Sequence, residues 1–215
     1  LWADYLRPRL DSTESGVIVD FLRTHADLPV AAELRFEFLR LLARRQEWQT
    51  LLDVYTPQAD IQMRCYQLLA RLKLGKQEYL MEDARSVWLS GESQPPQCDP
   101  VFAQLDTSDL LTPETVWERI GLAMDNGNTT LARWLGRRLP AADQVWLTRW
   151  PELHQNPGKL TGTPGWPDTE VTRDLLVHVT RRLTNQDVGK ARAAWRELRS
   201  HYAYTPGQAG PVEYE

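Results

Sequence analysis

The sequence has few of the features that place a chain in a special class. It contains two cysteines, its net charge is only −4, and no apolar run approaches the roughly 18 residues of a membrane span. Like charges occur in pairs rather than blocks, so no basic stripe for nucleic acid is present. Glycine, proline and charged residues are too few for a collagen-like, low-complexity or disordered chain. We expect a soluble globular protein whose 215 residues can bury their own core.

Motifs of common catalytic sites are also missing. The sequence has no G-x-S-x-G nucleophile elbow and neither of the glycine-rich loops that hold phosphates. Two cysteines without a nearby histidine pair cannot supply the four ligands of a closed zinc site. His25, His154, His178 and His201 are scattered, and we interpret them as structural rather than as general bases. We therefore predict no catalytic, metal-binding or cofactor-binding residue, and no cofactor.

Several polar groups nevertheless allow a functional interpretation beside a structural one. A glycosidase needs only one or two carboxylates in a cleft, but acids on polar helix faces are usually solvated. The arginines at 133, 137 and 138 beside Trp134 can form either a solvated face or a sugar-binding one. We favour the structural interpretation for the acids, which are Glu33, Glu37, Glu78, Glu82 and Asp83.

Apolar residues recur with the helical period along almost the whole sequence. Leu34, Phe38, Leu41 and Leu42 follow the spacing i, i+4, i+7, i+8, and the set that begins at Ile61 repeats it. No run alternates with the period of two that indicates a strand. We predict helices over residues 1–8, 14–25, 30–45, 47–55, 59–74, 77–90, 99–105, 113–126, 128–138, 141–150, 168–184 and 188–202.

Capping residues support these boundaries. Thr112 followed by Pro113 is typical of a helix start, and Gly91 and Gly127 stand where helices end. Asn128 begins a glycosylation sequon, but its position after a glycine favours a helix cap. The nine tryptophans are many for this length, and we expect most of them to be packed anchors.

Short turns join several predicted helices, so neighbouring helices should pack antiparallel. The turns lie at 45–47, 75–76, 126–128 and 185–187. This pattern predicts an all-α fold, a superhelical solenoid of antiparallel helix hairpins that is irregular and tetratricopeptide-like. We expect a single domain over 1–203, with a sub-block break at 151–167, and a frayed tail over 204–215.

The two cysteines have two interpretations. Cys65 lies on an apolar helix face and Cys98 in a proline-rich loop 33 positions later. We favour a disulfide that ties the loop to the helix hairpin, which implies an oxidising compartment. The alternative is a pair of unpaired cysteines, the usual state in a cytosolic protein.

Three strings carry a resemblance to a known family. VWLSGESQPPQCD at 87–99, LARRQEW at 42–48, and ERIGLAM at 118–124 followed by GNT at 127–129 resemble the helical N-terminal region of soluble lytic murein transglycosylases of Gram-negative bacteria. The similarity is clearest from about residue 30 to 145. In that family the region is a U-shaped superhelix, and it carries a disulfide where Cys65 and Cys98 fall, so the resemblance supports the pairing.

The resemblance also implies a function. It points to the periplasm and to a parent enzyme that cleaves the MurNAc–GlcNAc bond of peptidoglycan and leaves a 1,6-anhydromuramoyl end. The family's catalytic domain is marked by a Glu-Ser pair, a Gly-Leu-Met-Gln string and an Ala-Tyr-Asn string. This set is absent, since Glu14-Ser15 and Glu92-Ser93 stand in the wrong context and 121–124 and 203–205 do not match the other two strings.

We therefore expect a non-catalytic fragment, cut from or processed out of a longer chain because it begins at Leu1, that shapes access to a catalytic domain outside it. Its partners would be peptidoglycan glycan strands reached through the parent enzyme, and we expect a monomer. The alternative is a stand-alone helical-repeat scaffold that binds a cell-envelope protein or a glycan strand. A fragment would leave an apolar helix face uncovered near its end. The face that tests this is formed by Ala191, Trp195, Leu198 and Tyr202, which could also pack on helix 168–184.

Overall fold

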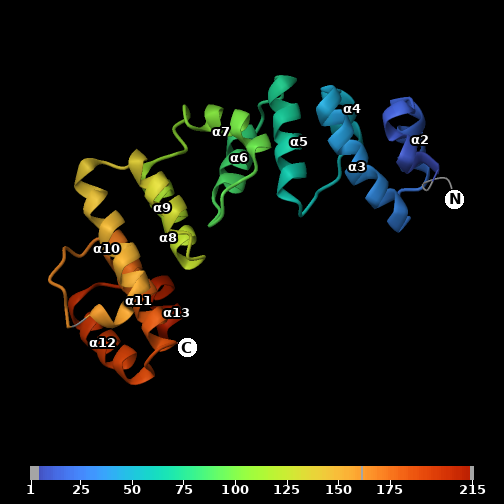
Figure 1. Cartoon of the computed structure of the whole chain (residues 1–215). Coiled ribbons are helices and arrows are strands. Elements are labelled where there is room, and N and C mark those ends of the chain that lie inside the picture. Colours follow the sequence, from blue (N-terminus) through green and yellow to red (C-terminus); the bar gives the residue numbers. More distant parts are fainter. Residues whose placement is uncertain (1–4, 161, 214–215) are drawn as a thin grey trace. The chain divides into compact units, whose positions relative to one another are not determined.

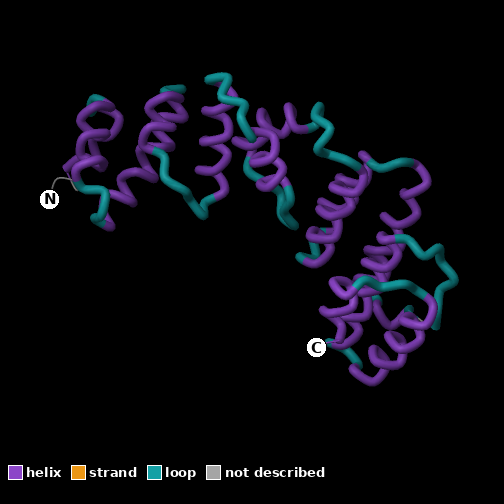
Figure 2. Tube along the Cα trace, turned by 180° about the vertical axis from the view of Figure 1, so that it is seen from behind, coloured by secondary structure: helices purple, strands orange, loops and turns teal. Residues whose placement is uncertain are grey.

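The computed structural model describes residues 5–160 and 162–213, and all regular elements in these ranges are helices (Figures 1 and 2). The predicted all-α class is therefore confirmed. None of the described helices is both long and apolar enough to cross a membrane. The α-helices are α2 Ser15–Thr24, α3 Pro29–Arg45, α4 Trp48–Val54, α5 Ile61–Lys73, α6 Leu80–Trp88, α7 Asp99–Leu105, α8 Pro113–Asp125, α9 Thr129–Leu135, α10 Gln144–Gln155, α11 Glu170–Thr184, α12 Val188–His201 and α13 Pro206–Glu213. Short 3-10 helices are η1 Arg7–Ser12, η2 Pro96–Cys98, η3 Gly136–Arg138, η4 Ala141–Asp143 and η5 Pro157–Lys159.

The chain forms two compact units. Unit 1 comprises Leu1–Trp88 and Gln94–Leu111, and unit 2 comprises Leu89–Ser93 and Thr112–Glu215. The boundary thus lies near residues 89–111, whereas the sequence suggests a break at 151–167. Pro151 does not end a helix, because α10 continues past it and buries Leu153 and His154 beyond it.

In unit 1, helices that follow one another in the chain pack against one another. Contacts join α2 to α3, α3 to α4, α4 to α5, α5 to α6 and α6 to α7. The apolar positions of α3 that follow the helical period are buried, with Phe38 and Leu42 fully enclosed. A disulfide joins Cys65 of α5 to Cys98 of η2, with Cα atoms 4.9 Å apart, and both cysteines are fully buried. It holds the proline-rich loop against the helix hairpin.

In unit 2, α11 is the central helix, because α8, α10, α12 and α13 all contact it (Figure 1). The apolar face of α12, formed by Ala191, Trp195 and Leu198, is buried together with Tyr202, and α12 packs on α11. Of the two expectations for this face, the one in which it packs back on helix 168–184 is confirmed. The face therefore gives no support to the fragment interpretation.

Helix ends follow the predicted capping signals closely. The turns after α3, α5 and α8 are centred on Gln46, Gly75 and Gly127, all with positive φ. At each turn two backbone hydrogen bonds form a Schellman motif, such as Asn128 N to Ala123 O at 2.7 Å. The predicted cap at Thr112 is confirmed, and the Asn128 side chain accepts a hydrogen bond from Leu131 N at 3.1 Å, so Asn128 is a cap as expected.

Gly91 has a different role from the predicted one. It does not end a helix, because α6 stops at Trp88. A Cβ at Gly91 would lie 2.4 Å from the backbone oxygen of Leu122, so only glycine lets this segment approach α8 so closely. The buried Arg119 guanidinium of α8 donates to the backbone oxygens of Ser90 and Glu92 in the same segment. The segment 89–93 is thus fixed to α8 by a close contact and by charge-assisted hydrogen bonds.

The C-terminal segment is more ordered than its sequence predicts. Residues 206–213 form α13 instead of the expected frayed tail, and Ala209 of α13 is buried. The segment folds because it packs on α11. Its glycines and prolines do not predict this tertiary contact. The predicted helix over 1–8 lies partly outside the described residues, which also exclude Trp2.

We expect that the Cys65→Ala/Cys98→Ala double variant loses roughly 3–4 kcal/mol of unfolding free energy, since the disulfide closes a loop of about 34 residues. Urea denaturation followed by circular dichroism measures this loss. Adding reductant under unfolding conditions should destabilise the wild-type protein and leave the double variant unchanged. Equal stability of the two proteins without reductant would contradict the prediction.

We also expect that Gly91→Ala lowers the unfolding free energy by about 1–3 kcal/mol, because the new methyl group would meet backbone rather than a movable side chain. Gly158→Ala is the matched control in the same unit, since nothing lies within 4 Å of its added Cβ. Thermal midpoints of the two variants measure the difference. A midpoint for Gly91→Ala equal to that of the control would refute the close approach.

Candidate functional site

Three titratable side chains from three helices form a hydrogen-bonded chain inside unit 2. His178 of α11 lies at its centre, with Nδ1 2.8 Å from Asp125 Oδ1 and Nε2 2.9 Å from His154 Nδ1. Asp125 ends α8 and His154 lies near the end of α10. Both histidines are buried, with 8% of His154 and 6% of His178 exposed. We call these three residues the relay, and it links α8, α10 and α11.

The hydrogen bonds assign the protons of the neutral relay. A carboxylate can only accept, so His178 Nδ1 carries a proton and donates it to Asp125. His178 Nε2 is then an acceptor, and His154 Nδ1 donates to it. Protonating both imidazoles would place two N–H groups against each other, so the relay cannot hold two added protons without breaking this bond.

Burial and neighbouring charges shift two pKa values in the relay. Burial lowers the pKa of His154, and the Arg182 guanidinium and His178 lower it further. Arg182 also donates to the His154 backbone oxygen at 2.7 Å, which holds the cation in place. The hydrogen bond from His178 lowers the pKa of Asp125 below its ordinary 3.8, against the opposing effect of burial. The relay thus favours an ionised Asp125 and a neutral His154.

A cavity of about 310 Å³ lies beside the relay. Trp117 and Trp150 line it as near-parallel rings with centroids 6.3 Å apart. Asp174 of α11 also lines the cavity; burial raises the pKa of Asp174, and Gln208 of α13 donates to it at 2.6 Å. The indole nitrogen of Trp150 is buried without a hydrogen-bond partner among the described residues.

The cavity is not suited to acid-catalysed glycoside cleavage by Asp125. A general acid must keep its proton near neutral pH, whereas the pKa of Asp125 is lowered. Asp174 has a raised pKa, but its Oδ1 already accepts the Gln208 amide. We therefore assign the relay a positioning role, in which one buried and one part-buried hydrogen bond link the three helices.

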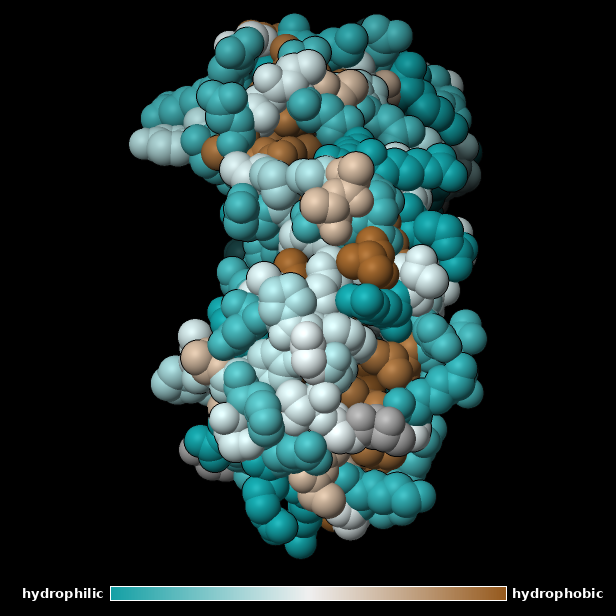
Figure 3. All heavy atoms as spheres, turned by 90° about the vertical axis from the view of Figure 1, so that its left-hand side faces the viewer, coloured by the Kyte–Doolittle hydropathy of each residue, from teal (hydrophilic) through white to brown (hydrophobic). Residues whose placement is uncertain are grey.

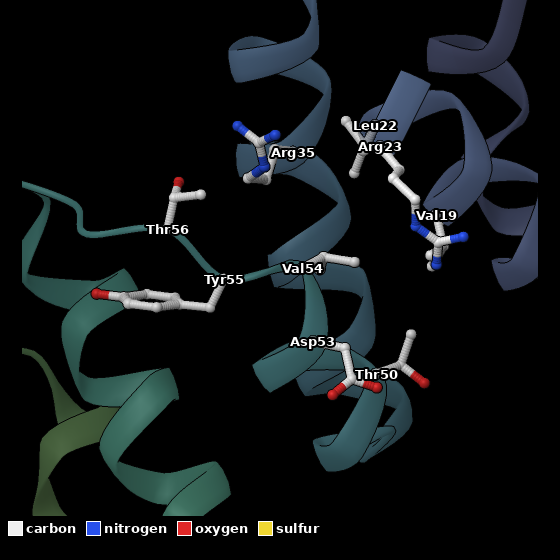
Figure 4. Close-up of a pocket in the computed structure, with 9 residues that line it drawn as sticks. All are labelled: Val19, Leu22, Arg23, Arg35, Thr50, Asp53, Val54, Tyr55 and Thr56. Atoms are coloured by element: carbon white, nitrogen blue, oxygen red, sulfur yellow. The ribbon is translucent and has the colours of Figure 1, made fainter. Parts of the chain in front are cut away.

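A second candidate site is a groove of about 250 Å³ in unit 1. Residues from α2, α3, α4 and the chain after α4 line it (Figure 4). Figure 4 shows the Arg35 guanidinium and the Thr56 hydroxyl on one side, with the Tyr55 ring below them. Arg23 and Asp53 line the other side. The groove therefore combines two cations, one carboxylate, hydroxyl groups and an aromatic ring.

The groups singled out in the sequence do not gather in one place. Asp83 forms an ion pair with Arg71 at 2.6 Å, and Arg7 pairs with Glu33 and Glu37. Glu78 and Glu82 are exposed. These carboxylates thus belong to polar surfaces, as expected.

The described tryptophans differ in how far they are buried. Trp88, Trp146, Trp150 and Trp195 are buried, whereas Trp134 is 44% exposed. The guanidinium of Arg138 lies 4.4 Å from the Trp134 ring centre, so that arginine stacks on the indole. On the face in Figure 3, hydrophobic residues appear as separate groups among polar ones.

Sequence reasoning missed both candidate sites. The sequence predicts that His154 and His178 are structural residues, but it gives no sign of their hydrogen bond, which joins residues 24 positions apart through a tertiary contact. Arg35 and Arg23 carry no motif. Within the described residues, no group of three or more His, Cys, Asp or Glu side chains is arranged to hold a metal ion.

No model of a protein family matches the sequence. Individual proteins do match it. The soluble lytic murein transglycosylase of Escherichia coli K12 is 32% identical over 178 residues, which cover 81% of this chain and 27% of that protein. The enzyme of the same name from Salmonella typhimurium is 31% identical over 180 residues, with the same coverage. The chain thus spans about a quarter of the length of these relatives.

Two solved structures of lytic transglycosylases are also similar to this chain. An inactive mutant of the lytic transglycosylase Slt from Pseudomonas aeruginosa superposes with a TM-score of 0.84 at 30% identity, over 97% of this chain and 34% of that one. The 70-kDa soluble lytic transglycosylase of Escherichia coli superposes with a TM-score of 0.73 at 27% identity, over 98% of this chain and 34% of that one.

We expect the stability of unit 2 to fall as the pH is lowered from 7.5 to 5. Because the pKa of His154 is lower in the folded protein, the unfolded chain takes up a proton first as the pH drops through about 6.5. The lowered pKa of Asp125 adds a further loss below about pH 4. Thermal midpoints measured across this range should drop by several degrees.

The variant His154→Gln should flatten the pH dependence between 7 and 5, although its absolute stability is lower. His25→Gln, at an exposed position, should keep the wild-type slope. An unchanged slope in His154→Gln would show that this histidine does not couple folding to pH.

Proposed function

Since the chain is homologous to part of the soluble lytic murein transglycosylases, we propose that it is a non-catalytic helical part of such an enzyme. The parent enzyme would cleave the MurNAc–GlcNAc bond of peptidoglycan and leave 1,6-anhydromuramoyl ends. The observation that carries the proposal is the match to about a quarter of each relative. The family's catalytic strings are missing from this chain, which supports a non-catalytic role.

In this proposal the chain corresponds to the N-terminal superhelix and shapes access to a catalytic domain outside it. In unit 1, each helix packs on the next one in the chain, an arrangement that is typical of helical scaffolds. We propose that the chain is monomeric and that it contacts peptidoglycan glycan strands as part of the parent enzyme. These assignments follow from the resemblance of the strings at 42–48, 87–99 and 118–129.

We place the protein in the periplasm. The fully buried Cys65–Cys98 disulfide supports this location, because disulfides persist in oxidising compartments and are rare in the cytosol. The alternative function is a stand-alone helical-repeat scaffold that binds a cell-envelope protein or a glycan strand. The covered face of α12 leaves this alternative open, since it removes the sequence argument against it.

The proposal predicts opposite results for the chain and for the natural protein that contains it. Purified chain incubated with peptidoglycan sacculi should release no anhydromuropeptides, whereas the longer protein should release them. Liquid chromatography with mass spectrometry identifies these products. Release by the chain alone would contradict the non-catalytic role, and a longer protein without this activity would contradict the parent function.

The size of the natural protein separates the two functions. We expect an immunoblot of a periplasmic extract to show a band well above 24.8 kDa, the mass of this chain. A band at 24.8 kDa would instead support the stand-alone scaffold. A signal confined to the cytosolic fraction would overturn the periplasmic assignment.

A further inference from the structure

We propose that the groove of unit 1 binds a free carboxylate of a murein peptide, with Arg35 as the main recognition residue. The inference rests on the proposed peptidoglycan function and adds a specific subsite to it. It begins from Arg35, which is half-buried on α3 and makes no hydrogen bond or ion pair with the other described residues. Arginines that are partly withdrawn from water normally have a partner, so this guanidinium is available for a ligand.

The groups around Arg35 suit an oxyanion. Figure 4 shows the Thr56 hydroxyl and the Arg35 guanidinium on the same side of the groove, where a planar carboxylate can accept from both. A guanidinium presents two parallel N–H donors, which match the two oxygens of a carboxylate. The Tyr55 ring forms an apolar wall that can contact the aliphatic part of the ligand.

The charge balance of the groove also favours an anion. Arg23 and Arg35 oppose one carboxylate, Asp53, whose Oδ1 already accepts a hydrogen bond from Gln49 at 2.7 Å. Among the described residues, Arg23 pairs only with Asp20, at 3.3 Å, and 75% of each side chain is exposed. Such exposed pairs contribute little to stability, so Arg23 can turn toward a bound anion.

The size of the groove limits the ligand. A volume of about 250 Å³ holds a short peptide segment but not a disaccharide together with its peptide. The ligand therefore enters with its peptide end, while the glycan stays outside the groove. Murein peptides carry free carboxylates, which gives the chemical class that Arg35 would recognise.

Isothermal titration of the purified chain with a disaccharide-tetrapeptide muropeptide tests the proposal. Arg35→Gln should weaken binding by about tenfold or more, because a charge-assisted bidentate contact is lost. Arg35→Lys should recover only part of the affinity, since an ammonium lacks the planar fork. Arg40→Gln is the matched control, because Arg40 lies exposed on the same helix outside the groove, and it should bind as the wild type does.

Ligand variants identify the recognised group. A muropeptide with amidated carboxylates should bind at least tenfold more weakly, and chitobiose, which has no carboxylate, should not bind measurably. Inorganic phosphate as a competitor distinguishes a general oxyanion site from one that needs the peptide, and we expect it to compete only weakly. Equal binding of amidated and free muropeptides, or displacement by low-millimolar phosphate, would overturn the peptide-carboxylate assignment.

The control measurements distinguish a failure of the proposed binding site from a failure of the proposed function. Arg35→Gln should keep the wild-type thermal midpoint, because Arg35 holds no other described group. If folded wild-type chain binds no muropeptide, or if Arg35→Gln binds as well as wild type, the groove is not the site. Release of anhydromuropeptides by the longer protein would in either case leave the proposed function standing.

Discussion

None of the described helices can bury its apolar face by itself, and the rest of the structure depends on that constraint. The α3 stripe is enclosed only because α2, α4 and α5 pack around it, and α11 is enclosed by α8, α10, α12 and α13. Each helix must therefore meet its neighbour at a fixed angle, which short turns with left-handed residues at Gln46, Gly75 and Gly127 provide. A turn that lost this geometry would separate two apolar faces, so the local backbone and the core depend on each other.

This dependence explains which features could be predicted from the sequence. Helix spacing and caps are local signals, so the bounds of α3, α5 and α8 agree with the predicted ones to within about two residues. Pro151 and α13 did not follow from local signals, because a proline inside a helix and a Gly-Pro-rich segment are tolerated only where tertiary packing compensates. Local signals predict a helix end at Gly91, whereas its close contact with α8 depends on a residue 31 positions away.

The candidate sites were less predictable than the fold for the same reason. The relay joins Asp125, His154 and His178, each of which lies in an ordinary helical context and gains a partner only after α8, α10 and α11 assemble. Arg35 occupies an ordinary position on a helix, and what distinguishes it is the lack of a hydrogen-bond or ion-pair partner among the described residues. Neither the hydrogen bonds of the relay nor the missing partner of Arg35 corresponds to a characteristic spacing of residues in the sequence. The disulfide could be predicted from the sequence only because two cysteines allow a single pairing and because the family resemblance supports it.

The two units use different kinds of link to hold their helices. In unit 1 the Cys65–Cys98 bond restricts the unfolded chain, and its contribution does not depend on protonation. In unit 2 the relay contributes hydrogen bonds among groups that include His154 and Asp125, whose pKa values are lowered in the folded protein, so its contribution depends on pH. Acid therefore weakens unit 2 before it affects the covalent link of unit 1, whereas reductant acts on unit 1 alone.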